Sequence, residues 1–229
     1  SIPNILFKWL KENTCKNYNG LCWGYNFPWQ NYYRRLPSNT PTIVNTSFIG
    51  HSLIDFFEVS KDVKIIDSIK SCCKFIITDL NQYQDDDGIC FSYTPLEDNV
   101  VHNANMLGMS FLSRAHKYTN DSEIIEYFRS TLNFSLRKQN NDGSWDYSIN
   151  IEKGNSRIQH DWHQGFIIDS LMHYIDSGDE LFAKECKLSI EKGLVFYRSL
   201  FDNKGAGFWR YPMKYPINIH NQAQGIITF

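Results

Sequence analysis

Apolar residues along the chain recur with the spacing of amphipathic helices. After Gly50 the apolar positions fall on one helical face, and the same pattern returns at two later places; the three sets are Leu53, Ile54, Phe56 and Phe57, then Leu107, Phe111, Leu112 and Ala115, then Ile167, Ile168, Leu171 and Met172. Further helices are predicted over 61–80, 121–138 and 180–200, because KD, ND and GDE precede them and suit helix N-termini. Only the FSYTP and WDYSI segments suggest short hairpin-like stretches, so the pattern predicts an all-α protein.

Two short motifs recur four times in the same order. The first places a turn glycine before an aromatic residue, one further residue and a tyrosine, as in NGLCWGY, DGICFSY, DGSWDY and KGAGFWRY. The second reads VNTSFIGHSL, VHNANMLGMSFL, IQHDWHQGFIIDSL and IHNQAQGIITF, and successive glycines in it are 58, 57 and 60 residues apart, at Gly50, Gly108, Gly165 and Gly225. Recurrence of two linked motifs at a near-constant spacing indicates a structural repeat.

The length of this repeat favours one architecture. A helical hairpin cannot bury its apolar face alone and must stack on its neighbours. A repeat of 57 to 60 residues exceeds the roughly 34–47 residues of common helical solenoids and suits the hairpins of an α/α toroid. We therefore predict a single toroid domain over residues 1–229. Because the fourth repeat has only started at Phe229, the chain is expected to be truncated at its C-terminus.

Composition excludes several function classes. The chain is 42% hydrophobic and 21% charged, as in ordinary globular proteins, which argues against disorder. Its net charge is −2 without a basic stripe, so a nucleic-acid partner is not expected. No apolar run reaches the length that a membrane span requires. The six cysteines form no CxxC pair, which predicts buried free thiols in a cytoplasmic protein, although a removed signal peptide would leave no trace.

Two resemblances follow from these motifs. The segment QNNDGSWDY, Gln139 to Tyr147, resembles the glutamine–tryptophan repeat of triterpene cyclases, which are α/α toroids. The wider layout resembles the six-hairpin carbohydrate enzymes: unsaturated-glucuronyl hydrolases, N-acylglucosamine epimerases and glucuronyl epimerases. The second resemblance implies a sugar-binding cleft between aromatic loops and polar helix starts. The chain departs from the terpene cyclases because its Asp85-Asp86-Asp87 run precedes a glycine instead of forming a DxDD motif, and no prenyltransferase metal-ligand pattern is evident.

The third repeat carries the residues that differ most from the other repeats. Its segment His160-Asp161-Trp162-His163 puts one carboxylate and two imidazoles in a helical turn, whereas the other repeats have Thr, Ala and Asn at the position of Asp161. We predict that Asp161 takes part in acid/base chemistry and that His160 and His163 orient it or the substrate. A hydrogen-bonded helix start is the alternative. Zinc is disfavoured because a single acid accompanies the histidines without HExxH spacing, so no metal or other cofactor is expected.

The acidic run is a candidate for the second carboxylate that glycoside hydrolysis requires. Asp87 is the candidate within it, and a solvated turn before Gly88 is the alternative. The run lacks the alternating ligand spacing of an EF-hand loop, which argues against calcium.

Loop aromatics and polar residues at helix starts are the candidates for substrate binding. The recurring aromatics also suit packing beneath their loops, and the Asn or His that precedes each repeat glycine by five residues also suits a helix cap; both interpretations stay open. The substrate-binding candidates are Trp23, Tyr25, Trp29, His102, Asn103, Asn105, Trp145, Trp162, Trp209 and His220.

The leading hypothesis is a carbohydrate-active protein that acts on an oligosaccharide or polysaccharide. It would be a glycoside hydrolase or an epimerase-like enzyme that uses carboxylate acid/base chemistry in an aromatic-lined cleft. One alternative is a terpene cyclase or prenyltransferase-like toroid, which requires a dry apolar cavity. Another is a non-catalytic toroid that binds a glycan or a protein. The polarity of the central cavity, and the presence of two facing carboxylates, separate these hypotheses.

Overall fold

The computed structural model describes residues 2–30, 35–119, 121–151 and 153–229, which form eight helices and seven short strands. The helices are α1 (Ile2–Glu12), α2 (Ile43–Ser60), α3 (Lys64–Asp79), α4 (His102–Thr119), α5 (Ser122–Arg137), α6 (His163–Ser177), α7 (Ala183–Ser199) and α8 (Ile219–Thr228). The strands are β1 (Trp29–Gln30), β2 (Arg35–Leu36), β3 (Gln82–Asp85), β4 (Gly88–Phe91), β5 (Val100–Val101), β6 (Ser148–Asn150) and β7 (Asn155–Arg157).

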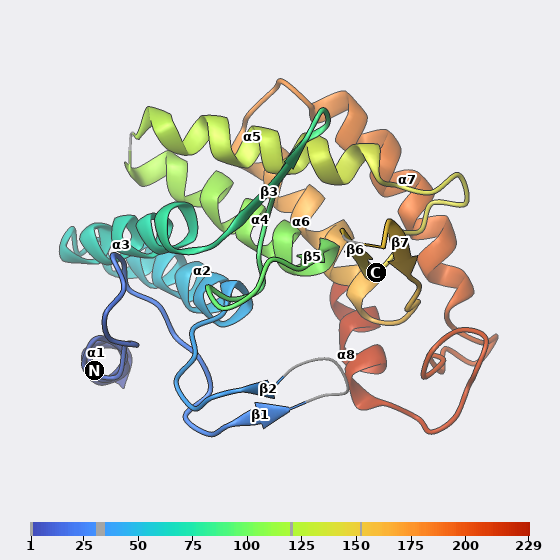
Figure 1. The fold of residues 1–229 in the computed structure, drawn as a ribbon, viewed down its shortest axis with the longest axis horizontal. Coiled ribbons are helices and arrows are strands. Elements are labelled where there is room, and N and C mark those ends of the chain that lie inside the picture. The colour runs from blue at the N-terminus through green and yellow to red at the C-terminus, as the bar shows by residue number, and fades with distance from the viewer. Residues whose placement is uncertain (1, 31–34, 120, 152) are drawn as a thin grey trace.

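The helices form two layers around a common axis. The inner helices α2, α4, α6 and α8 contact one another in succession, and the outer helices α3, α5 and α7 each pack on the inner helix before them (Figure 1). The outer helices coincide with the predicted ranges 61–80, 121–138 and 180–200. One buried apolar cluster extends across all three helical hairpins. The predicted architecture of stacked helical hairpins is therefore confirmed.

Three inner helices, α2, α4 and α8, begin before the Asn or His of the repeat, whereas α6 begins after His160. The side chain of Thr42 caps α2 by accepting from the Asn45 N–H, and Asn218 caps α8 by accepting from the His220 N–H. The prediction that Asn45 and His220 are themselves caps is wrong, because each lies inside the first helical turn. The Asn45 side chain instead accepts from the Thr42 hydroxyl at 2.7 Å, and Nδ1 of His220 lies 3.2 Å from Oδ1 of Asn218.

The acidic cap predicted before α5 is confirmed, because Asp121 accepts from the Glu123 N–H. The cap positions of α3 and α7 are instead Val63 and Phe182, which have no capping side-chain bond.

The repeated glycines mark places where backbones approach closely. A Cβ atom on Gly143 would lie 2.3 Å from the carbonyl oxygen of Lys192 in α7, and Gly143 has a φ of +91°, which favours glycine. The corresponding glycines of the first two repeats meet carbonyls of α3 and α5. Within the inner layer, a Cβ on Gly50 would lie 2.4 Å from the Phe111 ring. The glycines of the repeat therefore lie where a loop contacts its outer helix and where an inner helix contacts its neighbour.

Short strands link the loops at the mouth of the helical array. Strands β5, β6 and β7 form an antiparallel sheet in which Val100 pairs with Ile149 and Ser148 pairs with Arg157. This sheet joins the loop of the second repeat to that of the third. The predicted WDYSI hairpin is confirmed in part, because β6 begins at Ser148 and pairs with β7.

The cysteines are all free thiols, and each of them except Cys15 is buried, as predicted. No helix within the described ranges has both the length and the apolar character needed to cross a membrane.

Candidate active site

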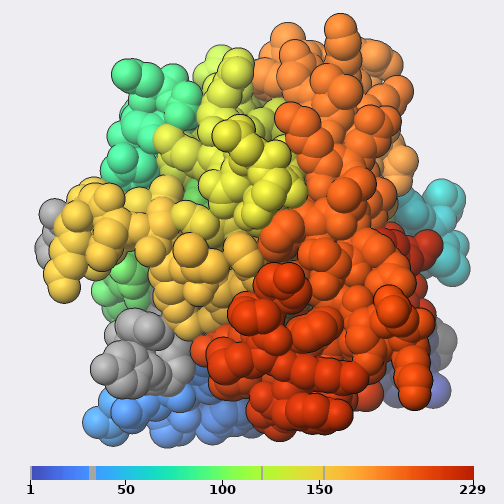
Figure 2. All heavy atoms as spheres, turned by 90° about the vertical axis from the view of Figure 1, so that its right-hand side faces the viewer, coloured from blue at the N-terminus to red at the C-terminus, as the bar shows by residue number. Residues whose placement is uncertain are grey.

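A cleft of about 980 Å³ opens where the inner helices begin. Figure 2 shows the gold β6–β7 hairpin beside the red-orange segment that precedes α8, and both contribute an arginine to the lining. All four inner helices and the preceding loops contribute side chains. The described residues that line it are Tyr25, Trp29, Val44, Phe48, Tyr93, Asn103, Leu107, Tyr147, Arg157, Gln159, Trp162, His163, Phe166, Arg210 and His220.

The recurring tyrosines belong to this cleft. Tyr25, Tyr93 and Tyr147 line it, one from each of the first three repeats, whereas Tyr211 is exposed and outside the lining. Tyr93 and Tyr147 also pack against the core cluster, so packing beneath the loop and access to the cleft apply to both of them. Because the same motif returns at each hairpin, the toroidal arrangement places these rings around one opening.

The tryptophans divide between the core and the cleft. Trp23 and Trp145 are buried, and their indole N–H groups donate to backbone carbonyls at 3.0 and 2.9 Å. Their burial and their absence from the cleft lining agree with packing beneath the loops, which is the alternative to substrate binding. Trp209 is half-buried and also outside that lining. Trp29 and Trp162 line the cleft, so two of the five tryptophans considered for substrate binding lie where a ligand has access.

A histidine–carboxylate pair lies at the start of α6. Nδ1 of His163 is 2.5 Å from Oδ1 of Asp161, whose side chain is fully buried. The same carboxylate accepts from the His163 backbone N–H at 3.1 Å and from Nε2 of Gln159 at 2.7 Å. An ionised carboxylate only accepts hydrogen bonds, so Nδ1 of His163 carries the proton and Nε2 of the neutral ring has the lone pair. Asp161 thus orients a cleft histidine and does not itself line the cleft.

His220 has a similar arrangement at the start of α8. Its Nδ1 is 3.2 Å from Oδ1 of Asn218, an oxygen that also accepts from the His220 backbone N–H at 2.9 Å. Donation from Nδ1 again leaves Nε2 as the basic nitrogen. The rings of His163 and His220 both stack on Trp162, with centroids 4.7 and 5.4 Å from the indole. Two imidazoles of the same tautomer therefore stack on the same indole in the cleft.

The first turn of α4 presents Asn103 to the cleft. Its Oδ1 is buried and has no hydrogen-bond partner among the described residues, so it can accept from a ligand hydroxyl. His102 and Asn105 lie behind it in the core. Asn105 Oδ1 accepts from the Phe91 N–H at 3.0 Å, and the ring of His102 stacks on Phe134. Burial lowers the pKa of His102 to about 4, so this ring is neutral near pH 7.

Two other catalytic candidates lie away from the cleft lining. Asp87 is 2.8 Å from Nζ of Lys138, which also contacts Asp85 at 3.0 Å, in the turn between β3 and β4. His160 packs edge-on against Phe196 with the ring centroids 4.8 Å apart, and burial lowers its pKa. The structure therefore brings Asp161, His163, Trp162 and His220 together and leaves Asp87 and His160 outside that group.

Sequence reasoning missed two arginines of the cleft. The guanidinium of Arg157 lies 4.7 Å from the Tyr147 ring centroid and donates to Gln159 Oε1 at 2.5 Å. That of Arg210 stacks on Trp209 at 4.8 Å. Arg210 stands beside the recurring aromatic of the fourth motif, a signal that could have been used. Arg157 reaches the cleft only through the pairing of β7 with β6. The described lining contains no Asp or Glu side chain.

Helical hairpins that gather their loops and inner-helix starts around one polar cleft define the arrangement of an α/α toroid. Solved structures with this fold include cellobiose 2-epimerases from Bacillus thermoamylovorans B4167 and Spirochaeta thermophila DSM 6192, with TM-scores of 0.70 and 0.68 and identities of 13% and 12%. They cover 97% and 96% of this chain. The α-mannanase BT2949 of Bacteroides thetaiotaomicron has a TM-score of 0.64 at 13% identity and covers 89%.

These likenesses confirm the predicted toroid fold. The chain spans 63%, 61% and 58% of the lengths of those three proteins, in the order given. No protein-family model and no curated protein matches its sequence. At such low identities the likeness concerns the fold, and the chemistry has to be argued from the residues of the cleft.

Proposed function

We propose that this chain carries the active cleft of a carbohydrate-active enzyme that transfers protons at a reducing sugar, as a sugar epimerase or isomerase. The observation that supports this most is the pair of imidazoles, His163 and His220, on one indole in the cleft, each with Nδ1 bonded to a fixed oxygen. Epimerase chemistry needs a base and an acid on a positioned substrate, and imidazole serves as both near neutral pH.

The reaction follows from the acidity of the C–H bond beside a carbonyl. In an open-chain aldose, Nε2 of His163 removes the proton from C2, and the electron pair forms an enediolate with the C1 carbonyl. When His220 is an imidazolium with a proton on Nε2, it delivers that proton to C2 from the other face, which gives the 2-epimer and leaves His163 protonated. Delivery of the His163 proton to C1, with the O2 proton passing to O1, gives the ketose. Asp161 accepts from Nδ1–H and stabilises the imidazolium that forms. Asn103 and the guanidinium groups supply polar contacts for sugar oxygens.

The lining of the cleft suits a sugar better than a hydrocarbon. Tyrosine and tryptophan rings provide faces on which pyranose C–H groups pack, while Asn, Gln, His and Arg side chains provide hydrogen bonds. A terpene cyclase requires an apolar cavity that is free of such groups, so the cyclase alternative gains no support here. The cellobiose 2-epimerases of similar fold support a saccharide substrate.

Glycoside hydrolysis is the second candidate, favoured by the likeness to an α-mannanase. It needs two carboxyl groups that flank the scissile bond. Asp161 is fully buried and Asp87 is paired with Lys138 away from the cleft lining. A hydrolase would therefore draw its carboxylates from outside the described lining. A purely glycan-binding toroid would use the same aromatic rings without any turnover.

The products formed from reducing disaccharides test this proposal. The protein is incubated with a panel of neutral and uronate disaccharides, and epimers, ketoses and monosaccharides are separated chromatographically. We expect epimers or ketoses from the wild type, a loss of at least about 100-fold in His163→Asn, and unchanged turnover in His116→Asn, whose ring lies near the end of α4 and bonds to the Asp121 carbonyl. Monosaccharides as the main product would favour hydrolysis, and binding without any product would favour the non-catalytic toroid.

A further inference from the structure

We infer that the saccharide bound in this cleft carries a carboxylate, and that the guanidinium groups of Arg210 and Arg157 receive it. This inference rests on the proposed function and specifies its substrate class as a uronate-containing saccharide. Three observations lead to it: an unpaired guanidinium in the cleft, a second arginine that connects the cleft to a polar side pocket, and the absence of acidic side chains from the described lining of both cavities.

Arg210 is a cation that has no counter-ion among the residues that the structure describes. Its Nε is buried without a hydrogen-bond partner among the described residues, and no described carboxylate forms an ion pair with its guanidinium. The group is held against the indole of Trp209, with 4.8 Å between its central carbon and the ring centroid. A partly buried, unpaired charge is costly to maintain. A carboxylate ligand would relieve that cost, because guanidinium N–H groups match carboxylate oxygens in bidentate geometry.

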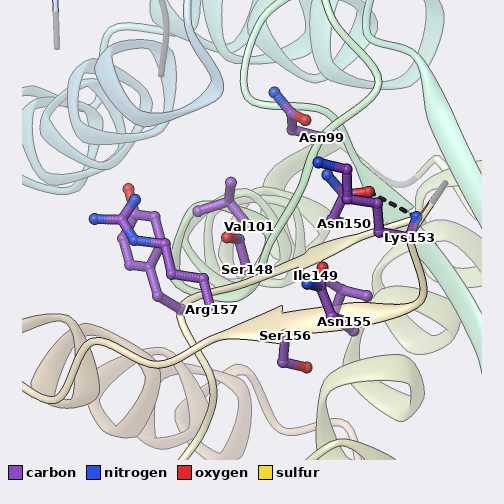
Figure 3. A pocket seen from close by; sticks show the side chains of 10 residues that line it. Asn99, Val101, Ser148, Ile149, Asn150, Lys153, Asn155, Ser156 and Arg157 are labelled. Carbon is purple, nitrogen blue, oxygen red and sulfur yellow. Dashed lines mark hydrogen bonds between the residues drawn. The ribbon is translucent and has the colours of Figure 1, made fainter. Parts of the chain in front are cut away.

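Arg157 lies where the cleft meets a side pocket of about 380 Å³ on the β5–β6–β7 sheet. Tyr147 and Arg157 line both cavities. Figure 3 shows Arg157 at one end of this side pocket, with Asn99 and Lys153 at the other. The remaining side chains that line it are Val101, Ser148, Ile149, Asn150, Asn155 and Ser156. A sugar chain that leaves the cleft along the sheet would therefore meet amides, hydroxyls and a second cation.

The positive lining is a local feature of the protein. The chain as a whole has 25 acidic and 23 basic residues, so an average surface of this protein would present both signs. The described side chains of the two cavities include Arg157, Arg210 and Lys153 and no acidic residue. A neutral sugar would form hydrogen bonds with such groups but would not compensate the charge of Arg210, whereas a uronate does both.

Binding of three matched oligosaccharides tests the inference by calorimetry at low and moderate salt. The probes are a uronic acid trisaccharide, its carboxyl-reduced neutral counterpart and a sulfated trisaccharide. The variants are Arg210→Gln, which removes the charge, Arg210→Lys, which retains it without the bidentate geometry, and Arg137→Gln, a control on the exposed end of α5. Urea unfolding of each variant verifies that it is folded.

We expect the wild type to bind the uronate about 10- to 100-fold more tightly than the reduced sugar, which corresponds to one or two charge-assisted hydrogen bonds. Arg210→Gln should remove most of this preference, because uronate binding weakens more than neutral binding, Arg210→Lys should retain more of the preference, and the control should resemble the wild type. Equal binding of both sugars by the wild type, or tighter binding of the sulfated probe, would overturn the inference. Turnover of neutral sugars that depends on His163 would in that case leave the proposed function standing.

Discussion

Replacing Asp161 by Asn perturbs the His163 ring without changing the shape of the site. The wild-type carboxylate accepts three hydrogen bonds, two from His163 and one from Gln159. An Asn side chain has one oxygen, so its NH₂ group has to face either His163 or the amide of Gln159. Gln159 cannot turn to accept without giving up its contact with Arg157. At least one of these contacts is therefore lost, together with the charge that stabilises the imidazolium.

The expected magnitudes follow from these contacts. Loss of one hydrogen bond to a buried charged group costs about 1–3 kcal/mol of the free energy of unfolding. Loss of the negative charge and of the enforced tautomer lowers turnover by about 10²–10⁴-fold, the range found where a carboxylate orients a catalytic histidine. Binding of the sugar should change by less than about threefold, because Asp161 does not line the cleft.

The assay combines steady-state kinetics with nitrogen NMR of the imidazole rings. In the wild type, the ¹⁵N shifts of His163 should show a protonated Nδ1 and an unprotonated Nε2, and in Asp161→Asn the tautomers should mix. Asp146→Asn is the matched control in the same repeat, because its carboxylate accepts from Asn140 in the loop. Turnover within threefold of the wild type in Asp161→Asn, with His163→Asn inactive, would refute the orienting role of Asp161.

Three further predictions concern stability and reactivity. Gly143→Ala should lower the free energy of unfolding by about 2–4 kcal/mol, because Gly143 has a positive φ and lies close to a carbonyl of α7. Gly154 also has a positive φ but has open space around it, so Gly154→Ala should lower the free energy of unfolding by only about 1 kcal/mol. Urea denaturation of both variants measures the difference. Burial lowers the pKa of His102 to about 4 in the folded protein, whereas the usual pKa of about 6.5 applies in the unfolded chain. Between pH 7.5 and 5 the unfolded chain therefore takes up a proton that the folded ring does not, and the free energy of unfolding of the wild type should fall by about 2 kcal/mol relative to that of His102→Phe. Equal pH dependence of the two proteins would contradict this. A hydrogen bond with the Cys22 thiol lowers the pKa of Cys15 to about 7. Iodoacetamide at pH 7.5 should therefore alkylate Cys15 at least about tenfold faster than the buried thiols, which mass spectrometry would measure.

Much of the fold was predictable because the repeat records packing contacts that are local in each hairpin. The spacing of Gly50, Gly108, Gly165 and Gly225 located the inner helices, and acidic residues before the outer helices located their starts. The sequence pattern placed the caps of α2 and α8 at Asn45 and His220 instead of Thr42 and Asn218. The cap depends on where the chain enters the helix, and Asn and His can stand before or after that point.

The site was less predictable because it depends on contacts between repeats. The unusual third repeat drew attention to Asp161 and His163, but not to the division of roles in which the carboxylate is buried and the imidazole lines the cleft. Arg157 enters the cleft through strand pairing, and Arg210 through the path of the loop before α8. A comparison of the repeats could not distinguish the buried Trp145 from Tyr147, which lines the cleft, because both residues recur at the same spacing.

Exchange of carbon-bound hydrogen with solvent tests the central claim most directly. Neutral and uronate reducing saccharides are incubated with the protein in D₂O, and the ¹H NMR signal of the proton on C2 is followed beside the anomeric signals. Proton transfer by the cleft imidazoles predicts that deuterium replaces the proton on C2 with the wild type and not with His163→Asn. Release of new reducing ends with the original C2 proton retained would contradict the account and identify the chain as a glycoside hydrolase.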